Sequence, residues 1–479
     1  MNLTQLSLLR TREALDNGEF SAVELTSACI QLAKANTSNA FITLTEEQAV
    51  TAAQAAQKLI EAGESTALTG IPCTLKDNIC TAEVPTTCGS EMLRDFKPYY
   101  NAAVVDELDK LGAVVIGKTN MDEFAMGNSS RTSAFGAVKN PLDSARVAGG
   151  SSSGSAAAVA DGSCVFSLGT DTGGSIRQPS AFCGVVGLKP TYERISRKGV
   201  VAFSGSFDTV GPIGRTAMDC AVVMDALTGT DCVSRLSMGV DAVRGKRIAI
   251  VTELMSDLVS DEVAEAVHYI VKILKNMGCS VTEVSLPILQ YSAPAYIAIS
   301  CAEAVSALSR YDGIKYGLRG NGNGYEEMLR DSRTRGFGEE VKRRLLLGNY
   351  VLSGANMTEL FDKSVAIKQQ TERDFCGVFA DCDVVISPTT TRLAFGVEEP
   401  YDAATAYASM ICTTPMSLAG LPCANAPCRG LGGMPIGISV TGNKFDDATV
   451  LQVANVIEQI GSPFSIEQYS GAAQSGGAV

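Results

Sequence analysis

Two glycine–serine loops hold the residues whose types and spacing are best suited to chemistry in this chain of 479 residues. The first loop, residues 149–155, reads GGSSSGS, and the second, residues 169–177, reads GTDTGGSIR. Because glycine lacks a Cβ atom, the second loop can approach a ligand and turn successive N–H groups toward a developing negative charge. The second loop is therefore a candidate oxyanion hole, and both loops offer candidate serine nucleophiles.

Three other interpretations of these loops are weaker. A flexible linker is disfavoured because an apolar run at residues 164–168 joins the loops as a buried strand. Phosphate binding is disfavoured because neither loop contains the lysine of a P-loop. Residues 150–154 match the Gly-x-Ser-x-Gly pattern of α/β-hydrolases, but the only histidine, His268, lies in a predicted amphipathic helix. A serine nucleophile would need another base.

Lys76 is the candidate for that base. It stands at the end of a short apolar run, in the segment GIPCTLKDN at residues 70–78. Lysines are mostly solvated, but a lysine that burial deprotonates is a good general base. Asp122 and Glu123 are adjacent in sequence and need not share a face, so we do not interpret them as a catalytic carboxylate pair.

Composition narrows the class of protein. With 46% hydrophobic residues the chain can bury a large core, and a net charge of −13 disfavours direct, non-specific nucleic-acid binding. Fifteen cysteines without a Cys-x-x-Cys pair indicate reduced, mostly buried thiols. No signal peptide and no apolar run of about 18 residues are present, so a cytoplasmic protein is expected.

The loops must be positioned by regular elements, which the hydrophobic pattern predicts along the whole chain. Ser155 is expected to cap a small alanine-rich helix that Gly162 ends. The order of strand, helix and strand over residues 247–284 predicts a parallel βαβ unit. Residues 291–368 read as mostly helical, with a glycine-rich break at 317–324. The other helices are predicted at 21–36, 46–63, 104–111, 261–278 and 448–460, and strands at 113–117, 164–168, 183–190, 247–251, 279–284, 383–388 and 436–440.

We therefore expect one compact α/β domain, in which helices cover both faces of a mixed, largely parallel β-sheet. The predicted domain spans residues 1–468, with a helical lead-in over 1–63 and the two loops in a core at 70–230. The small, polar residues 469–479 are predicted to be disordered. A chain of two domains is the alternative.

Taken together, residues 70–78, 149–155 and 169–177 resemble the signature of the amidase signature family, and the similarity extends over nearly the full length. Within that family, residues 118–127, KTNMDEFAMG, and 183–192, CGVVGLKPTY, are similar to the A subunits of glutamyl-tRNA(Gln) amidotransferases. The resemblance implies a single amidase domain with a Ser-Ser-Lys triad. Ser175 would be the nucleophile, Ser151 a bridging serine in a cis peptide, and Lys76 the base.

The resemblance also implies where the substrate binds. Backbone N–H groups of Thr172, Gly173 and Gly174, together with that of the nucleophile, would form the oxyanion hole. Arg344 would bind the α-carboxylate of glutamine, and Tyr296 would pack beside it. Both belong to the helical segment 291–368, which would lie on the substrate side.

Relatives of this kind hydrolyse glutamine and pass ammonia to a B subunit, which phosphorylates and amidates Glu-tRNA(Gln), while a small C subunit wraps around the glutamine-hydrolysing one. The resemblance therefore implies B and C subunits and glutamine as partners, contact with tRNA only through the B subunit, and no membrane. It implies no cofactor in this chain, since ATP and Mg would bind the B subunit.

Three positions depart from the family pattern. Ser153 and Glu193 replace glycines, and neither belongs to the triad. Met410 stands where the A subunits carry an aspartate that meets the α-ammonium of glutamine. A stand-alone amidase acting on another small amide is therefore the alternative function. A non-catalytic scaffold is a third interpretation, which the intact Lys76, Ser151 and Ser175 disfavour.

Overall fold

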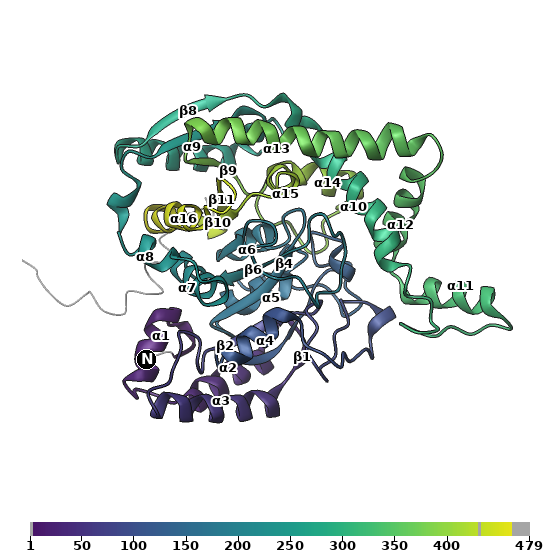
Figure 1. Ribbon diagram of the computed structural model, residues 1–479, viewed down its shortest axis with the longest axis horizontal. Coiled ribbons are helices and arrows are strands. Elements are labelled where there is room, and N and C mark those ends of the chain that lie inside the picture. Colours follow the sequence, from purple (N-terminus) through teal and green to yellow (C-terminus); the bar gives the residue numbers. More distant parts are fainter. Residues whose placement is uncertain (1–2, 430–432, 462–479) are drawn as a thin grey trace, which may run out of the picture.

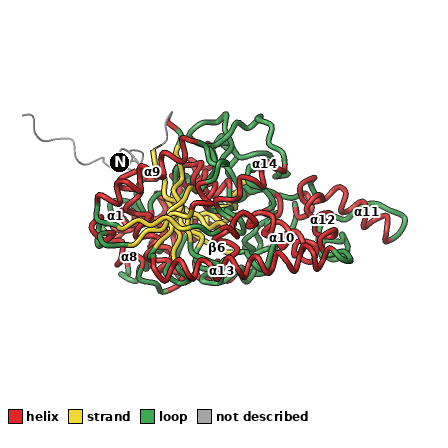
Figure 2. Tube along the Cα trace, turned by 90° about the horizontal axis from the view of Figure 1, so that it is seen from above, coloured by secondary structure: helices red, strands yellow, loops and turns green. Residues whose placement is uncertain are grey.

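One eleven-stranded β-sheet runs through the computed structural model, which describes residues 3–429 and 433–461. Its strand order is β1-β3-β2-β4-β6-β5-β10-β11-β9-β7-β8. Figure 2 shows the strands in the interior with helices around them. The strands are β1 (Phe41–Leu44), β2 (Pro72–Lys76), β3 (Val114–Thr119), β4 (Phe166–Asp171), β5 (Val186–Lys189), β6 (Thr209–Gly214), β7 (Arg247–Val251), β8 (Ser280–Val284), β9 (Val384–Pro388), β10 (Cys423–Arg429) and β11 (Pro435–Gly442).

Helices cover both faces of this sheet. Gly437 and Gly442 of β11 lie on opposite faces, and a Cβ atom would meet Ala181 of α6 at the first and Val450 of α16 at the second. The N-terminal helices lie together at one end, and α11 projects from the body in both views (Figures 1 and 2). The helices are α1 (Leu8–Asp16), α2 (Ala22–Ala35), α3 (Glu46–Glu61), α4 (Ala103–Lys110), α5 (Ser153–Ala160), α6 (Arg177–Cys183), α7 (Ala217–Thr228), α8 (Cys232–Leu236), α9 (Asp261–Asn276), α10 (Ser292–Leu308), α11 (Tyr325–Gly336), α12 (Glu339–Val351), α13 (Lys363–Asp381), α14 (Ala403–Ala408), α15 (Thr414–Leu418) and α16 (Asp447–Gly461).

The predicted α/β class and the single mixed sheet are confirmed, but the expectation of a largely parallel sheet is wrong. Four pairings are parallel: β2–β3, β2–β4, β7–β8 and β7–β9. Six are antiparallel: β1–β3, β4–β6, β5–β6, β5–β10, β10–β11 and β9–β11. Strands β1, β6 and β10 were not among the predicted elements, and every pairing that they make is antiparallel.

Several predicted elements are confirmed. β7 has the predicted limits, α9 occupies most of 261–278, and β7 and β8 form the expected parallel pair around α9. Helix α2 lies within the predicted helix at 21–36, and Ser21 and Glu24 form a capping box at its start. The predicted disorder of residues 469–479 lies outside the described residues.

The expected cap at Ser155 is wrong. Helix α5 already begins at Ser153, so Ser155 lies inside it, and its hydroxyl is hydrogen-bonded to that of Thr119 at 2.7 Å. The residue before the helix, Ser152, places its hydroxyl on the carbonyl oxygen of Thr170 at 3.0 Å rather than on the helix. The serines of the first loop therefore connect α5 to neighbouring strands.

The thiols are free, as expected. All fifteen cysteines lie in the described ranges, and all are buried except Cys376, which is exposed on α13. None of the described helices is long and apolar enough to cross a membrane.

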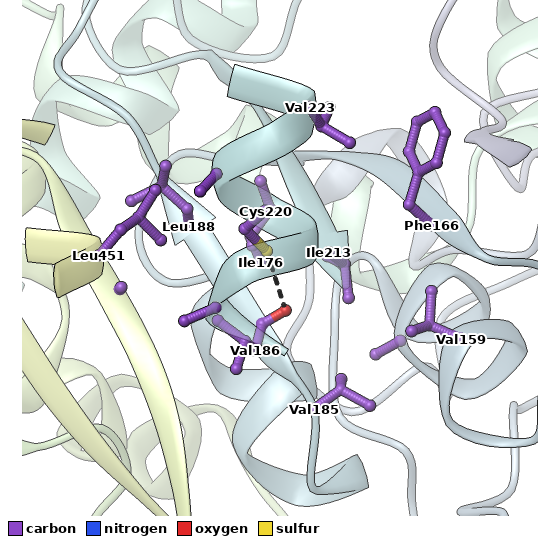
Figure 3. Close-up of a cluster of buried hydrophobic side chains, with 14 of the residues drawn as sticks. Val159, Phe166, Ile176, Val185, Val186, Leu188, Ile213, Cys220, Val223 and Leu451 are labelled. Carbon is purple, nitrogen blue, oxygen red and sulfur yellow. Dashed lines mark hydrogen bonds between the residues drawn. The ribbon is translucent and has the colours of Figure 1, made fainter. Parts of the chain in front are cut away.

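The core beneath the two loops is continuous between strands and helices. Figure 3 shows Val159 of α5, Phe166 of β4 and Ile213 of β6 in this cluster, with Cys220 of α7 donating from Sγ to the carbonyl oxygen of Val186 at 3.7 Å. This packing holds the amino end of β4, and the second loop starts from the carboxyl end of the same strand.

Candidate active site

Two parallel strands bring the candidate residues to one edge of the sheet. Lys76 is the last residue of β2, and the loop containing Ser175 follows directly after β4. β2 and β4 are parallel neighbours, so their carboxyl ends lie together. Helix α5, which follows Ser151, packs against β2, β3 and β4. The two loops and the lysine therefore meet although they are far apart in sequence.

Lys76 contacts Ser151 as the sequence predicts. Its Nζ donates to Ser151 Oγ at 2.7 Å, to Thr170 Oγ1 at 2.9 Å and to the Thr170 carbonyl oxygen at 3.2 Å. Lys76 and Ser151 are fully buried, and the peptide bond between Gly150 and Ser151 is cis, as the resemblance implies. Thr170, which the sequence analysis did not identify, also accepts from Asn78 Nδ2 at 3.0 Å and so orients the lysine.

Burial shifts Lys76 toward its neutral form. Removal from water disfavours the ammonium form and lowers the pKa of Lys76 from 10.5 to about 7, against the opposing charges of Asp122, Asp171 and Asp208. A large fraction of the side chain is therefore the free amine at neutral pH.

Ser175 is fixed by the residue that follows it. Ile176 is buried, and a Cβ atom at Gly169, Gly187 or Gly211 would lie about 3 Å from its side chain, at 3.1, 2.9 and 3.0 Å. These glycines belong to the adjacent strands β4, β5 and β6, so Ile176 packs against backbone that carries no side chain. This packing anchors the chain directly beside the candidate nucleophile.

The two loops are joined through backbone. The Ser152 N–H donates to the Ser175 carbonyl oxygen at 3.0 Å. In the part of the chain that the structure describes, no hydrogen bond joins the hydroxyls of Ser151 and Ser175. Ser175 lines a cavity of about 110 Å³.

The predicted oxyanion hole needs one correction. The Gly174 N–H donates to Asp171 Oδ1 at 2.8 Å, so it is already engaged and does not fit the role of donor. Within the described residues, the N–H groups of Thr172, Gly173 and Ser175 have no hydrogen-bond partner. They are the backbone donors that this loop leaves free.

A buried ion pair holds the second loop, residues 169–177, which we call the oxyanion loop after its proposed role. Arg177 Nε and Nη2 donate to the two carboxylate oxygens of Asp171, each at 3.0 Å, and both side chains are fully buried. Burial alone would raise the pKa of Asp171, but the charge of Arg177 outweighs it and lowers that pKa to about 2. Asp171 therefore stays ionised and also accepts the N–H of Ile176 at 3.1 Å.

The cavity beside Ser175 also contains the predicted substrate residues. Tyr296 Oη and Thr172 Oγ1 are hydrogen-bonded at 2.8 Å, which connects α10 to the oxyanion loop. Arg344 of α12 is 5% exposed, and Met410 lies in a 3₁₀ turn, η8 (Ser409–Cys412). The cavity is lined by Ala125, Gly127, Asn128, Ser129, Thr132, Gly150, Gly173, Gly174, Ser175, Gln178, Tyr296, Glu340, Arg344, Thr389, Tyr401, Asp402, Ala403, Ala406, Tyr407, Ser409, Met410 and Thr413.

Arg344 keeps its terminal nitrogens available. Its Nε donates to Glu340 Oε1 at 2.7 Å, one turn earlier on α12. No hydrogen bond within the described ranges engages its two terminal nitrogens. Glu340 thus orients a guanidinium whose forked end can receive a carboxylate in the cavity.

Two residues that position the first loop could not be identified from the sequence. Asp122 accepts from the Ser130 N–H at 3.0 Å and the Thr132 hydroxyl at 2.8 Å, and a Cβ atom at Gly150 would lie 1.9 Å from its Oδ2. Gln178 Oε1 accepts the Gly150 N–H at 2.8 Å. Only the folded chain brings these residues to the first loop, so spacing in the sequence gives no signal for them.

The remaining titratable candidates lie elsewhere. Glu123 accepts the Gly338 N–H at 2.9 Å, whereas Asp122 faces the first loop, so the two carboxylates do not form a pair. His268 is exposed on α9, as expected of a residue on a helix face. In the described ranges no group of three His, Cys, Asp or Glu side chains is arranged to hold a metal ion.

Comparison with known proteins agrees with this architecture. The family model described as Amidase matches residues 24–451. The chain is 44% identical over 474 residues to the A subunit of glutamyl-tRNA(Gln) amidotransferase from Bacillus cytotoxicus, covering 96% of this chain and 98% of the relative. The protein of the same name from Thermoanaerobacter pseudethanolicus is 41% identical over 473 residues, covering 96% and 97%.

A solved structure shows the same fold. The crystal structure of the corresponding A subunit of glutamyl-tRNA(Gln) amidotransferase from Thermotoga maritima superposes with a TM-score of 0.77 at 33% identity, covering 96% of each chain. The family match spans both loops, Lys76 and the strands that position them. This chain belongs to the amidase family.

Proposed function

We propose that the chain hydrolyses glutamine at Ser175 and supplies the ammonia to a partner protein, which converts Glu-tRNA(Gln) to Gln-tRNA(Gln). The observation that carries the proposal is the buried contact of Lys76 with Ser151 beside a cavity that contains both Ser175 and Arg344. The names of the relatives at 41% and 44% identity support glutamyl-tRNA(Gln) amidotransferase as the wider system.

The chemistry starts with a proton transfer. Neutral Lys76 takes a proton from Ser151, which takes one from Ser175, and Ser175 Oγ attacks the side-chain amide carbon of glutamine. The N–H groups of Thr172, Gly173 and Ser175 donate hydrogen bonds to the amide oxygen as it becomes negatively charged. When the C–N bond breaks, the same relay returns the proton to the departing ammonia, and water then hydrolyses the acyl-enzyme.

The end of the cavity at Arg344, away from Ser175, would bind the α-carboxylate of the substrate. The two free terminal nitrogens of Arg344 match a carboxylate in a bidentate arrangement. Tyr296 would lie between Arg344 and the oxyanion loop, to which its hydroxyl is hydrogen-bonded at Thr172. In this proposal the substrate is held at both ends, which places its amide near Ser175.

The partners follow from the proposed system. A B-type subunit would bind ATP, Mg and tRNA, and a small C-type subunit would accompany it. The chain described here would touch tRNA only through the B-type subunit, need no cofactor of its own, and act in the cytoplasm. The net charge of −13 supports this division, since such a chain does not favour direct contact with tRNA.

A direct test uses the full-length chain purified from its own cells with the proteins that accompany it. We expect B-type and C-type subunits to copurify, and glutamine hydrolysis to rise when Glu-tRNA(Gln) and ATP are added. Ser175→Ala should abolish hydrolysis while the complex stays intact, because it removes the attacking oxygen and little volume. His268→Ala is the control and should keep normal turnover. An active Ser175→Ala complex would disprove the proposal.

Met410 favours a second candidate, a stand-alone amidase for a small carboxylated amide without an α-amino group. The methionine lines the cavity and offers no charge to an ammonium group. Glutaramate, which is glutamine without its α-amino group, separates the two functions. Faster turnover of glutaramate than of glutamine, with no partner subunits attached, would support the amidase instead.

A further inference from the structure

The peptide unit between Gly173 and Gly174 is held at both ends by side chains. Its carbonyl oxygen accepts the Thr413 hydroxyl at 2.6 Å, and its N–H donates to Asp171 Oδ1 at 2.8 Å. Thr413 is 3% exposed and comes from the turn between η8 and α15, 240 positions away in the chain. The contact therefore joins the oxyanion loop to a distant segment of the cavity wall.

Thr413 also packs directly against this loop. A Cβ atom at Gly174, whose φ is +125°, would lie 2.6 Å from Thr413 Oγ1. Arg177 fixes Thr413 from the other side, because its Nη1 donates to the Thr413 carbonyl oxygen at 2.9 Å. Thr413 thus has its backbone held by Arg177 and its hydroxyl turned to the loop.

Two glycines in succession need such an external support. Each peptide unit is planar, but the φ and ψ angles on both sides of it turn freely at glycine. Without support, the neighbouring N–H groups of Gly173 and Ser175 would point over a range of directions. Holding the central peptide at both ends removes most of that freedom, and the two N–H groups on either side stay aimed into the cavity.

We propose that Thr413 is a positioning residue that orients the oxyanion hole. The proposal rests on the proposed role of Ser175 as nucleophile, but it does not depend on which amide is the substrate. The Thr413 hydroxyl bonds neither the serines of the proton relay nor Arg344. Its other acceptor is the Met410 carbonyl oxygen at 3.4 Å, which the Thr414 hydroxyl also contacts, at 2.9 Å. Its loss should therefore slow the step in which negative charge develops and leave substrate binding nearly unchanged.

The test compares three variants of the full-length chain, in its complex where partners copurify. Thr413→Val keeps the shape and removes the hydroxyl, and Thr413→Ser restores it. Thr414→Val is the matched control: this neighbouring threonine is also buried, and its hydroxyl donates to the Met410 carbonyl oxygen at 2.9 Å, away from the loop. We expect Thr413→Val to lower kcat by roughly tenfold to hundredfold with KM changed less than about twofold, and the other two variants to stay near wild type.

A second readout makes the test independent of glutamine. A fluorophosphonate forms a bond from Ser175 Oγ to phosphorus and expels fluoride, while the serine proton passes to Lys76. Negative charge develops on the phosphoryl oxygen, so labelling needs the same N–H groups. We expect Thr413→Val to slow labelling by a factor similar to that for kcat, and Thr413→Ser to restore it.

The outcomes are distinguishable. Slow labelling of Thr413→Val in a chain that does not hydrolyse glutamine would support the role of Thr413 and contradict the proposed function. Normal labelling of Thr413→Val, or equal slowing in Thr414→Val, would overturn the role of Thr413. Should Thr413→Val fail to fold in a thermal melt, Thr413→Cys, with its weak S–H donor, replaces it under the same criteria. A wild-type chain that is not labelled at Ser175 would overturn both proposals.

Discussion

Two buried lysines at the same edge of the sheet differ in their partners. Nζ of Lys118, in β3, lies 3.5 Å from Asp77 Oδ1, whereas within the described residues Nζ of Lys76 is bonded only to the hydroxyls of Ser151 and Thr170 and to one carbonyl oxygen. Burial lowers the pKa of both, and Asp77 opposes the shift at Lys118. The lysine without a contacting carboxylate is thus the one beside the candidate nucleophile.

The pH profile of hydrolysis should report Lys76. Activity should rise with pH through an apparent pKa near 7, because burial lowers the pKa of Lys76 to about 7 and only the free amine accepts a proton. Lys76→Arg should be inactive, since arginine stays charged. Steady-state rates between pH 5.5 and about 9 provide the measurement. An active arginine variant would show that the position needs only a positive charge.

The lowered pKa of Lys76 also makes the stability of the chain depend on pH. The folded pKa of about 7 lies below the unfolded value of 10.5, so the unfolded chain binds more protons between these two values. The burial of Lys76 therefore costs stability fully below about pH 7, and the cost fades as the pH rises toward 10.5.

We expect Met410 to weaken glutamine binding, because a carboxylate at this position would give the α-ammonium a charge-assisted contact of about 1.5–3 kcal/mol. Met410→Asp should therefore lower the KM for glutamine by roughly tenfold to hundredfold, with a smaller change in kcat. Initial-rate kinetics on glutamine and glutaramate measure this, and glutaramate should not gain. If glutamine kinetics stay the same or worsen, another group already holds the ammonium.

At the scale of residues, the sequence predicts those that share a motif and misses those that meet only in the fold. Lys76, Ser151 and Ser175 were identified because each lies in a segment typical of the family. Thr170 lies inside such a segment, yet its contact with Lys76 requires the pairing of β2 with β4. Gly174 was assigned the wrong role because nothing in the sequence shows that Asp171 engages its N–H.

At the scale of elements, proline is the reason that two central strands were not predicted. Proline cannot donate to a ladder and argues against a central strand, yet Pro212 lies in β6 and Pro427 in β10. β5 pairs with only Ile213 and Gly214 of β6, and with only Cys423–Asn425 of β10. Both prolines therefore lie beyond the ladders with β5. The apolar pattern predicted β7 and β9 well because neither strand has this interruption in its interior.

Close packing of α5 reverses an ordinary helix preference. Alanine is normally about 1 kcal/mol better than glycine inside a helix. A Cβ atom at Gly154, however, would lie 2.2 Å from the Ala40 carbonyl oxygen and 2.6 Å from the Asn120 nitrogen. Gly154→Ala should therefore destabilise the chain by roughly 1–3 kcal/mol, measured by denaturant unfolding.

Gly377 of α13 provides the matched control. It is also a helical glycine, but a Cβ atom there would meet nothing within 4 Å. Gly377→Ala should stabilise the chain by about 1 kcal/mol. Equal effects of the two substitutions would contradict the close approach of α5 to the backbone around Ala40 and Asn120.

At the scale of the whole molecule, the sheet ties distant parts of the sequence together. β5 pairs with β10, more than 200 residues later, and α16 packs against β10, β11 and α7. The order of predicted helices and strands led to the expectation of a single α/β domain. The strand order was not predicted, since pairing between remote segments leaves no mark in local periodicity.

The number of thiols that react with a reagent can report how far the chain has unfolded. Of fifteen cysteines, only Cys376 is exposed, which leaves fourteen shielded. A chromogenic disulfide reagent should therefore react quickly with one thiol per native chain and with the other fourteen only as the chain opens. Absorbance against time would give both the number of reactive thiols and the rate of opening, and Cys376→Ser should remove the fast phase alone. Several fast thiols would mean that the interior around the strands exchanges with solvent while the protein is still folded.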